Sequence, residues 1–274
     1  MSSCDPYRLT GMTNYVSSPD GTKIAYERLG DGPPVVLASG LFCHRPMTQP
    51  LAERLARDFT VVHYDRRGRG ESGDTPPYAV EREVEDLAAL IDAVGGAAAV
   101  YGHSSGAGLA LEAAARGVPI TALVLHEPPY GADDEEEKEQ ARRLADDIRT
   151  AVAEGRRADA VKLFLTASGM PPEMADQLAG DPGMQAVAPT MPYDFDVMGN
   201  TSRGGVIPED LLQAIGVPTL VLAGTASPDF FRHAATRIAE FLPQGRYTLL
   251  EGQDHGAPAE VVAPVVAEFL LAAR

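Results

Sequence analysis

The sequence lacks the features that mark disulfide-rich and membrane-spanning proteins. Its 274 residues include two cysteines, Cys4 and Cys43, which are too few for a disulfide framework, so we expect reduced thiols. No run of about twenty apolar residues is present, as a membrane-spanning helix would need. The opening MSSCDPYRLT also has no basic stretch followed by an apolar one, so we expect no secretion signal.

Basic charge is scarce as well. Lysine and arginine number 23 against 39 aspartates and glutamates, which gives a net charge of -16. Such a chain repels phosphates and anionic lipid headgroups. Arginine far outnumbers lysine and alanine is abundant, as is typical of GC-rich bacterial genomes. We therefore expect a cytoplasmic bacterial protein, a monomer or homodimer, whose partner is a small molecule and not nucleic acid or a membrane.

Short apolar runs alternate with amphipathic helical patterns along most of the chain. The stretch from Tyr15 to Gly30 predicts a hairpin that turns at Pro19-Asp20-Gly21. Continuous apolar runs, typical of parallel strands buried on both faces, follow at residues 34–39, 59–65, 97–102, 121–127, 218–224 and 246–252. Helical patterns occupy residues 50–58, 81–96, 229–243 and 257–273. The alternation predicts an α/β fold, a doubly wound and mostly parallel sheet with helices on both faces.

One region interrupts this alternation. From Pro128 to about Gly205 the strand signal is missing, and helical patterns are broken by prolines. We therefore expect a core domain of residues 1–127 and 206–274, with residues 128–205 inserted as a helical cap. The acidic run at residues 133–139 stands at a predicted helix start, where the helix dipole favours carboxylates, so it predicts a solvated helix end.

The segment VYGHSSGAGLALEAAARG contains the strongest chemical signal. Its residues Gly102-His103-Ser104-Ser105-Gly106 fit G-x-S-x-G between a predicted strand and a predicted helix. In this motif a nucleophilic serine occupies a sharp, strained turn, and the two glycines avoid clashes with the adjoining elements. Ser104 is the candidate nucleophile, and the backbone N–H of Ser105 is a candidate oxyanion donor. Close helix–strand packing alone would also explain the glycines.

At this point the chain resembles the α/β-hydrolase family, over nearly its whole length. Four segments carry the resemblance: VVLASGLF (35–42), DRRGRGESGD (65–74), the serine turn, and LEGQDHG (250–256). The resemblance implies a second oxyanion donor, the N–H of Leu41, and a turn-shaping role for Asp65. Ser39 replaces the histidine that the family usually has there, which leaves a backbone donor unaffected. The resemblance and the absence of a ligand pattern imply no cofactor and no metal.

A serine nucleophile needs a histidine to remove its proton. His63 and His126 lie within predicted buried strands, whereas His255 lies on a loop after the last predicted strand, where this fold presents its sites. His255 is therefore the candidate base.

The carboxylate that would orient His255 is left open. The family usually places an aspartate at the position of Ser227, and Asp229 lies two residues further on. However, Ser227-Pro228-Asp229 also fits a helix start, with Ser227 as N-cap. Glu127 closes a predicted strand, at a position that haloalkane dehalogenases use for their acid, and we expect Pro128 to keep it extended. We favour Glu127, with Asp229 as the alternative and Asp254 or no carboxylate behind it.

These residues predict acyl transfer. We expect a serine hydrolase that cleaves a small to medium, largely apolar ester, lactone or thioester through an acyl-enzyme on Ser104. Phe42, Tyr193 and Phe195 are candidate substrate contacts, although their spacing also fits cap-to-core packing. Two alternatives stay open: a cofactor-free haloperoxidase, lyase or cyclase activity on the same residues, and a receptor-like ligand-binding protein with slow or no turnover.

Overall fold

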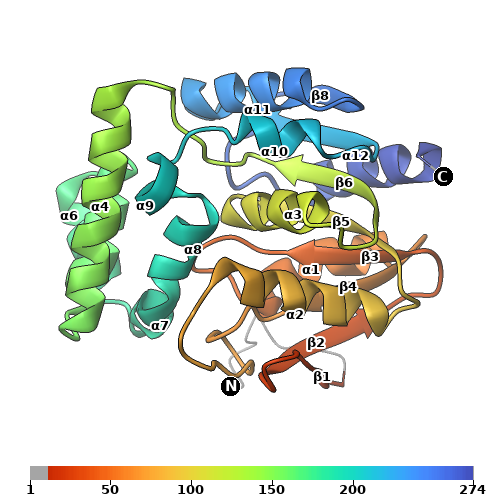
Figure 1. The fold of residues 1–274 in the computed structure, drawn as a ribbon, viewed down its shortest axis with the longest axis horizontal. Coiled ribbons are helices and arrows are strands. Elements are labelled where there is room, and N and C mark those ends of the chain that lie inside the picture. The colour runs from red at the N-terminus through yellow and green to blue at the C-terminus, as the bar shows by residue number, and fades with distance from the viewer. Residues whose placement is uncertain (1–11, 274) are drawn as a thin grey trace, which may run out of the picture.

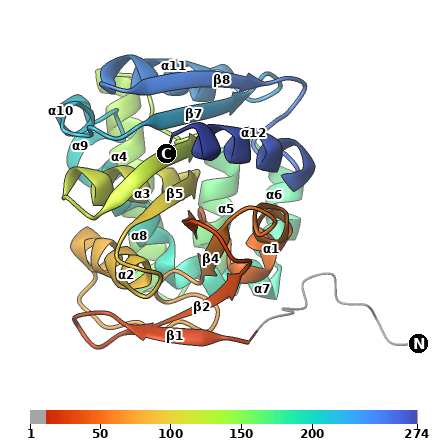
Figure 2. The same cartoon turned by 90° about the vertical axis from the view of Figure 1, so that its right-hand side faces the viewer.

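A computed structural model describes residues 12–273, so Cys4 lies outside the described residues. The fold is built on a sheet of eight strands in the order β1-β2-β4-β3-β5-β6-β7-β8 (Figures 1 and 2). The strands are β1 (Asn14–Ser17), β2 (Lys23–Leu29), β3 (Pro34–Ala38), β4 (Thr60–Tyr64), β5 (Ala98–His103), β6 (Ile120–His126), β7 (Thr219–Gly224) and β8 (Gly245–Leu250). β1 and β2 form the predicted hairpin, β2 pairs antiparallel with β4, and the remaining pairs are parallel.

Helices cover both faces of the sheet, as predicted (Figure 2). The helices of this layer are α1 (Arg45–Leu55), α2 (Val80–Asp92), α3 (Ser105–Ala115), α10 (Glu209–Gln213), α11 (Asp229–Phe241) and α12 (Ala259–Ala272). Alternate strand residues supply two apolar clusters: Val36 and Val62 pack with α2, α3 and α11, whereas Val35 and Val61 pack with α1 and α12. Among the described residues, no helix is both long and apolar enough to cross a membrane.

Helix α1 begins earlier than its sequence pattern suggests. The expected start was Pro50, but the helix begins at Arg45 and carries Pro50 in its interior. A contact distant in sequence explains the difference, because the backbone N–H of Arg45 donates to Oδ1 of Asp65 at 2.8 Å. This carboxylate caps the helix, and no local sequence pattern announces it.

Between β6 and α10 the chain forms short and long helices but no further strand of the sheet, at one end of the sheet (Figure 1). They are α4 (Glu135–Ala153), α5 (Arg157–Ala167), α6 (Pro172–Ala179), α7 (Pro182–Val187), α8 (Met191–Val197) and α9 (Asn200–Arg203), with a 3-10 turn at Ala188–Thr190. We call residues 128–205 the cap segment. Its two ends meet where the N–H of Gly131 donates to the oxygen of Gly205 at 2.9 Å. The division into a core domain and a cap domain stays a prediction.

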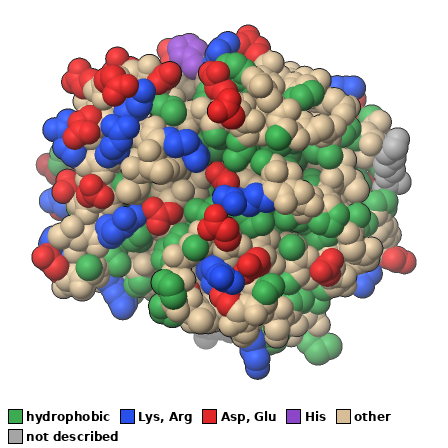
Figure 3. All heavy atoms as spheres, viewed as in Figure 1, with side chains coloured by type: hydrophobic (Ala, Val, Ile, Leu, Met, Phe, Trp, Pro, Cys, Tyr) green, Lys and Arg blue, Asp and Glu red, His purple; other side chains and the backbone are tan. Residues whose placement is uncertain are grey.

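The acidic run forms the solvated helix start that its position predicts. Asp134 caps α4 by accepting hydrogen bonds from the N–H groups of Glu136 and Glu137 at 2.9 and 3.1 Å. Lys138 then pairs with the exposed Asp133 and Glu135. Figure 3 shows charged side chains of both signs gathered at the left of the view, over α4. Capping and local ion pairs account for the run.

Two histidines are buried inside the sheet, as their strands predict. His63 of β4 is fully buried, and burial lowers its pKa to about 4. Its Nδ1 lies 3.0 Å from Oγ1 of Thr48, which itself donates to the oxygen of Arg45, so Nδ1 carries the proton and the ring is neutral. Burial likewise lowers the pKa of His126 in β6 to about 4, and its Nδ1 lies 2.7 Å from the hydroxyl of Tyr101.

The buried His63 predicts a loss of stability in mild acid. Its pKa is lowered in the folded state, so as the pH falls below about 6.5 the unfolded chain binds the proton first. The contribution of His63 to the free energy of unfolding is therefore fully present above pH 6.5. It is lost as the pH falls to about 4, and the loss amounts to ~3 kcal/mol. Urea unfolding of His63→Gln at several pH values should show a shallower decline than the unmodified protein. His233→Gln, at an exposed position, should decline as the unmodified protein does; equal slopes in all three would contradict the prediction.

Candidate active site

Ser104 occupies a strained turn between β5 and α3. Its φ of +57° and ψ of -127° are conformations that residues with a side chain rarely adopt. A Cβ atom on Gly102 would lie 2.5 Å from the oxygen of Gly106, and one on Gly106 would lie 2.2 Å from the oxygen of Ala38. Both glycines of the motif are therefore required by close backbone approach. The N–H of Ser104 donates to the oxygen of His126 at 2.9 Å, which anchors the turn to β6.

The loop after β3 passes directly beside this serine. A Cβ atom on Gly40 would lie 2.8 Å from Cβ and 3.3 Å from Oγ of Ser104. Leu41 follows in this loop, and Ser105 begins α3. Within the part of the chain that the structure describes, neither the N–H of Leu41 nor that of Ser105 donates a hydrogen bond. Both donors are therefore free of protein partners, and the oxyanion role that the resemblance implies for them stays a prediction.

The structure pairs His255 with Glu127. Nδ1 of His255 lies 2.7 Å from Oε2 of Glu127, which is fully buried at the end of β6. The N–H of Gly224 and the hydroxyl of Ser227 donate to Oε1 at 2.7 and 2.5 Å. Burial alone would raise the pKa of Glu127, but these hydrogen bonds from His255, Gly224 and Ser227 hold it below its ordinary value. An ionised Glu127 accepts from Nδ1 of His255 and so favours the tautomer in which Nδ1 carries the proton and Nε2 does not.

The other candidate acids lie elsewhere. Asp229 is exposed and pairs with Arg232, and Asp254 accepts a hydrogen bond from the N–H of Gly256 at 2.9 Å. The helix start expected at Ser227 is wrong by one residue, because α11 begins at Asp229 with Pro228 as its N-cap residue. Ser227 instead donates to Glu127, a contact that its helix-start pattern conceals.

The backbone at Glu127 also differs from expectation. Pro128 was expected to keep it extended, but its φ is +48°. The carboxylate meets donors from two separate loops, Ser227 after β7 and His255 after β8. These three short hydrogen bonds offset a strain that costs roughly 1–3 kcal/mol.

Two aromatic rings hold the imidazole of His255. The ring centroids of His103 and of Phe231, from α11, each lie 4.6 Å from that of His255. Nε2 of His103 lies 3.0 Å from the backbone oxygen of His255, so this nitrogen carries the proton and donates it. Burial holds the pKa of His103 well below its ordinary value, which keeps the ring neutral. The residue before Ser104 thus ties the serine turn to the His255 loop, a role that sequence reasoning missed.

The predicted substrate contacts lie in two places. Phe42 packs on Phe164 of α5 with ring centroids 5.6 Å apart, and Phe164 packs on Phe195 of α8 at 6.3 Å. Tyr193 instead stacks on Tyr78 at 3.7 Å, and its hydroxyl donates to Asp74 at 2.7 Å. The structure therefore joins Phe42 and Phe195 through the cap segment, and it places Tyr193 in a contact between cap segment and core.

Comparison with known proteins agrees with this geometry. The sequence profile of the alpha/beta hydrolase family matches residues 35–268. The chain belongs to the alpha/beta hydrolase family. Its eight-stranded, mostly parallel sheet is the fold of that family. A solved alpha/beta hydrolase from Sphaerobacter thermophilus is 51% identical, covers 94% of this chain and all of that one, and superposes with a TM-score of 0.83.

More distant relatives carry more specific names. A thermophilic esterase from Thermogutta terrifontis is 26% identical, covers 96% of this chain and 99% of its own, and has a TM-score of 0.71. The N-formylmaleamate deformylase of Pseudomonas putida is 35% identical over 117 residues, or 41% of this chain and 44% of that protein. The chain spans less than half the length of the curated relatives that it matches in sequence.

The serine turn predicts a sharp difference between two glycines. Gly106→Ala should place a methyl group 2.2 Å from the oxygen of Ala38, and such overpacking against backbone costs about 1–3 kcal/mol or more. Gly216→Ala is the control, because Gly216 has open space around the added atom. Urea unfolding should show a lower midpoint for Gly106→Ala and an unchanged or slightly higher one for Gly216→Ala. Equal midpoints for the two variants would contradict the close approach.

Proposed function

We propose that this hydrolase cleaves small to medium, largely apolar esters, lactones or thioesters through an acyl-enzyme on Ser104. The observation that carries the proposal is the 2.7 Å contact between His255 and a buried Glu127. The ring of His255 also contacts that of His103, which directly precedes a serine held at positive φ. A carboxylate, an imidazole and a strained serine in this order form the constellation of serine hydrolases, which is recognised by geometry and roles.

In this mechanism His255 accepts the proton of Ser104 on Nε2 while Oγ attacks the carbonyl carbon. The N–H groups of Leu41 and Ser105 stabilise the oxyanion that forms. The tetrahedral intermediate then expels the alcohol or thiol, which takes the proton from His255. A water molecule, deprotonated by His255, releases the acid in the same way. Glu127 stays ionised throughout and stabilises the imidazolium.

The surroundings of the site favour an apolar acyl group. Leu41 and Phe42 follow the glycine beside Ser104 and pack against the apolar cluster of the cap segment, which includes Phe195. The relationship to a protein named as an esterase supports an ester as the substrate. Apolar surface of this kind binds acyl chains by excluding water, at roughly 0.8 kcal/mol per buried methylene.

A fluorophosphonate tests the nucleophile directly. The unmodified protein should form one covalent adduct on Ser104, whereas Ser104→Ala should form none, and intact mass followed by peptide mapping measures this. A series of p-nitrophenyl esters of increasing acyl length should then be hydrolysed by the unmodified protein alone. A folded protein that forms no adduct, or forms it on another residue, would overturn the proposal; saturable ligand binding without turnover would favour a receptor.

The acid is tested by two substitutions that remove charge. Glu127→Gln should lower kcat by about 10⁴-fold, because the imidazole loses the partner that fixes its tautomer and stabilises its positive charge. Asp229→Asn should change kcat little, because Asp229 pairs with Arg232 at the surface. Circular dichroism verifies the fold of both variants. Comparable turnover by Glu127→Gln and the unmodified protein would assign the role to another group.

A further inference from the structure

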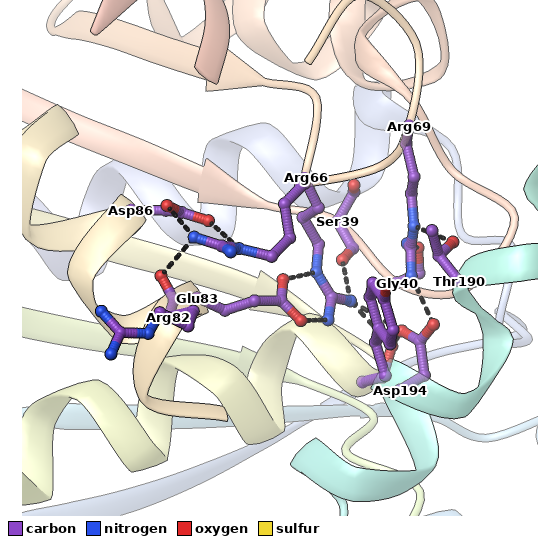
Figure 4. A network of polar contacts seen from close by, with 12 residues as sticks. Ser39, Gly40, Arg66, Arg69, Arg82, Glu83, Asp86, Thr190 and Asp194 are labelled. Carbon is purple, nitrogen blue, oxygen red and sulfur yellow. Dashed lines mark hydrogen bonds and ion pairs between the residues drawn. The ribbon is translucent and has the colours of Figure 1, made fainter. Parts of the chain in front are cut away.

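Beside the candidate site, two buried arginines connect the core to the cap segment (Figure 4). Arg66 is 1% exposed and forms a paired contact with Glu83, with both N–O distances 2.7 Å. Its third nitrogen, Nη1, donates to the backbone oxygen of Ser39 at 3.2 Å and to Oδ1 of Asp194 at 2.7 Å. Asp194 belongs to α8 and is 3% exposed.

Arg69 makes the parallel connection. Its Nη1 donates to the backbone oxygen of Gly40 at 2.9 Å, its Nε donates to Oγ1 of Thr190 at 3.1 Å, and its Nη2 pairs with Oδ2 of Asp194. Both arginines therefore hold consecutive carbonyl groups of the loop beside Ser104 on one side, and the same cap carboxylate on the other. Burial alone would raise the pKa of Asp194, but Arg69 and Arg66 hold it below its ordinary value.

These contacts orient the backbone donors on both sides of Ser104. In a trans peptide, the C=O of one residue and the N–H of the next point in opposite directions. Because Arg69 binds the C=O of Gly40, the N–H of Leu41 points in the opposite direction, away from Arg69, within the same peptide plane. On the second side, the hydroxyl of Ser105 donates to Oδ1 of Asp194 at 2.5 Å. Asp194 is thus bonded directly to Ser105, and through Arg69 to the peptide between Gly40 and Leu41.

We propose that Asp194 is a positioning residue for the oxyanion site. When α8 packs on the core, the contacts of Asp194 align the N–H groups of Leu41 and Ser105 at the same time. This inference rests on the proposed function. The network joins two cations, Arg66 and Arg69, to two anions, Glu83 and Asp194, and all four are buried. Buried ion pairs contribute little net stability compared with apolar packing, so their direct contacts to the loop carbonyls favour a role in geometry.

Two variants and a control test the proposal. Asp194→Asn removes the shared charge, and Ser105→Ala removes only the link from α3, leaving its N–H in place. The control is Asp74→Ala, which removes the hydrogen bond from the hydroxyl of Tyr193 to Asp74. This bond also joins the cap segment to the core but involves neither arginine nor Asp194. For each folded variant, the rate constant for phosphonylation of Ser104 is measured well below the unfolding midpoint, together with kcat and KM on p-nitrophenyl acetate.

Misalignment of the oxyanion site should slow both reactions of the folded protein. Asp194→Asn should lower the phosphonylation rate constant and kcat by about 10- to 100-fold, with KM within about threefold, because the donors matter most in the transition state. Ser105→Ala should lower both by a smaller factor, and Asp74→Ala should change neither beyond about twofold. A role in stability alone would lower the unfolding midpoint and leave these rates unchanged.

The possible outcomes separate this inference from the proposed function. An Asp194→Asn variant that folds and reacts like the unmodified protein would overturn the inference and leave the proposed function standing. If Asp194→Asn does not fold, Ser105→Ala decides, and an unchanged rate there overturns the inference. Absence of a Ser104 adduct in the unmodified protein would overturn the proposed function, and the inference with it.

Discussion

The candidate site depends on backbone strain just beyond the carboxyl ends of three inner strands of the sheet. Among the described residues, three that are not glycine have positive φ: Phe42 at +62°, Ser104 at +57° and Glu127 at +48°. Each follows the carboxyl end of β3, β5 or β6, which are neighbours in the sheet. Such conformations cost roughly 1–3 kcal/mol each and persist only where the surrounding structure enforces them. The buried parallel sheet therefore enforces the three turns from which the site is built.

The core of the fold and the strained serine turn were predictable because their signals are local. Continuous apolar runs identify buried parallel strands. The two glycines around Ser104 indicate that backbone segments approach each other closely there, as they do in the structure. Glu127 was favoured because an ionisable residue at the end of an apolar strand needs a partner. Its positive φ could not be foreseen, because a following proline normally excludes it and tertiary contacts override that preference.

The remaining contacts join residues far apart in the chain. Ser227 reads locally as a helix start, and its bond to Glu127 spans 100 positions. The contact of Arg66 with Asp194 spans 128 positions, and nothing in either local segment predicts the pair. His103 occupies a variable position of the serine motif and gains its role only when the His255 loop is placed beside it. Spacing in a single sequence cannot reveal such pairs.

The arginine-rich loop shows how an acidic protein uses its few cations. Against a net charge of -16, Arg66, Arg67 and Arg69 are each at most 2% exposed. Each finds a carboxylate from another element: Arg66 and Arg69 contact Asp194, and Arg67 contacts Asp86 of α2 at 2.7 Å. Removing Asp194 would leave Arg66 and Arg69 with Glu83 as their one buried carboxylate, and an uncompensated buried charge is strongly destabilising. The loop is therefore locked between α2 and α8, and the carbonyl groups beside Ser104 acquire rigid donors.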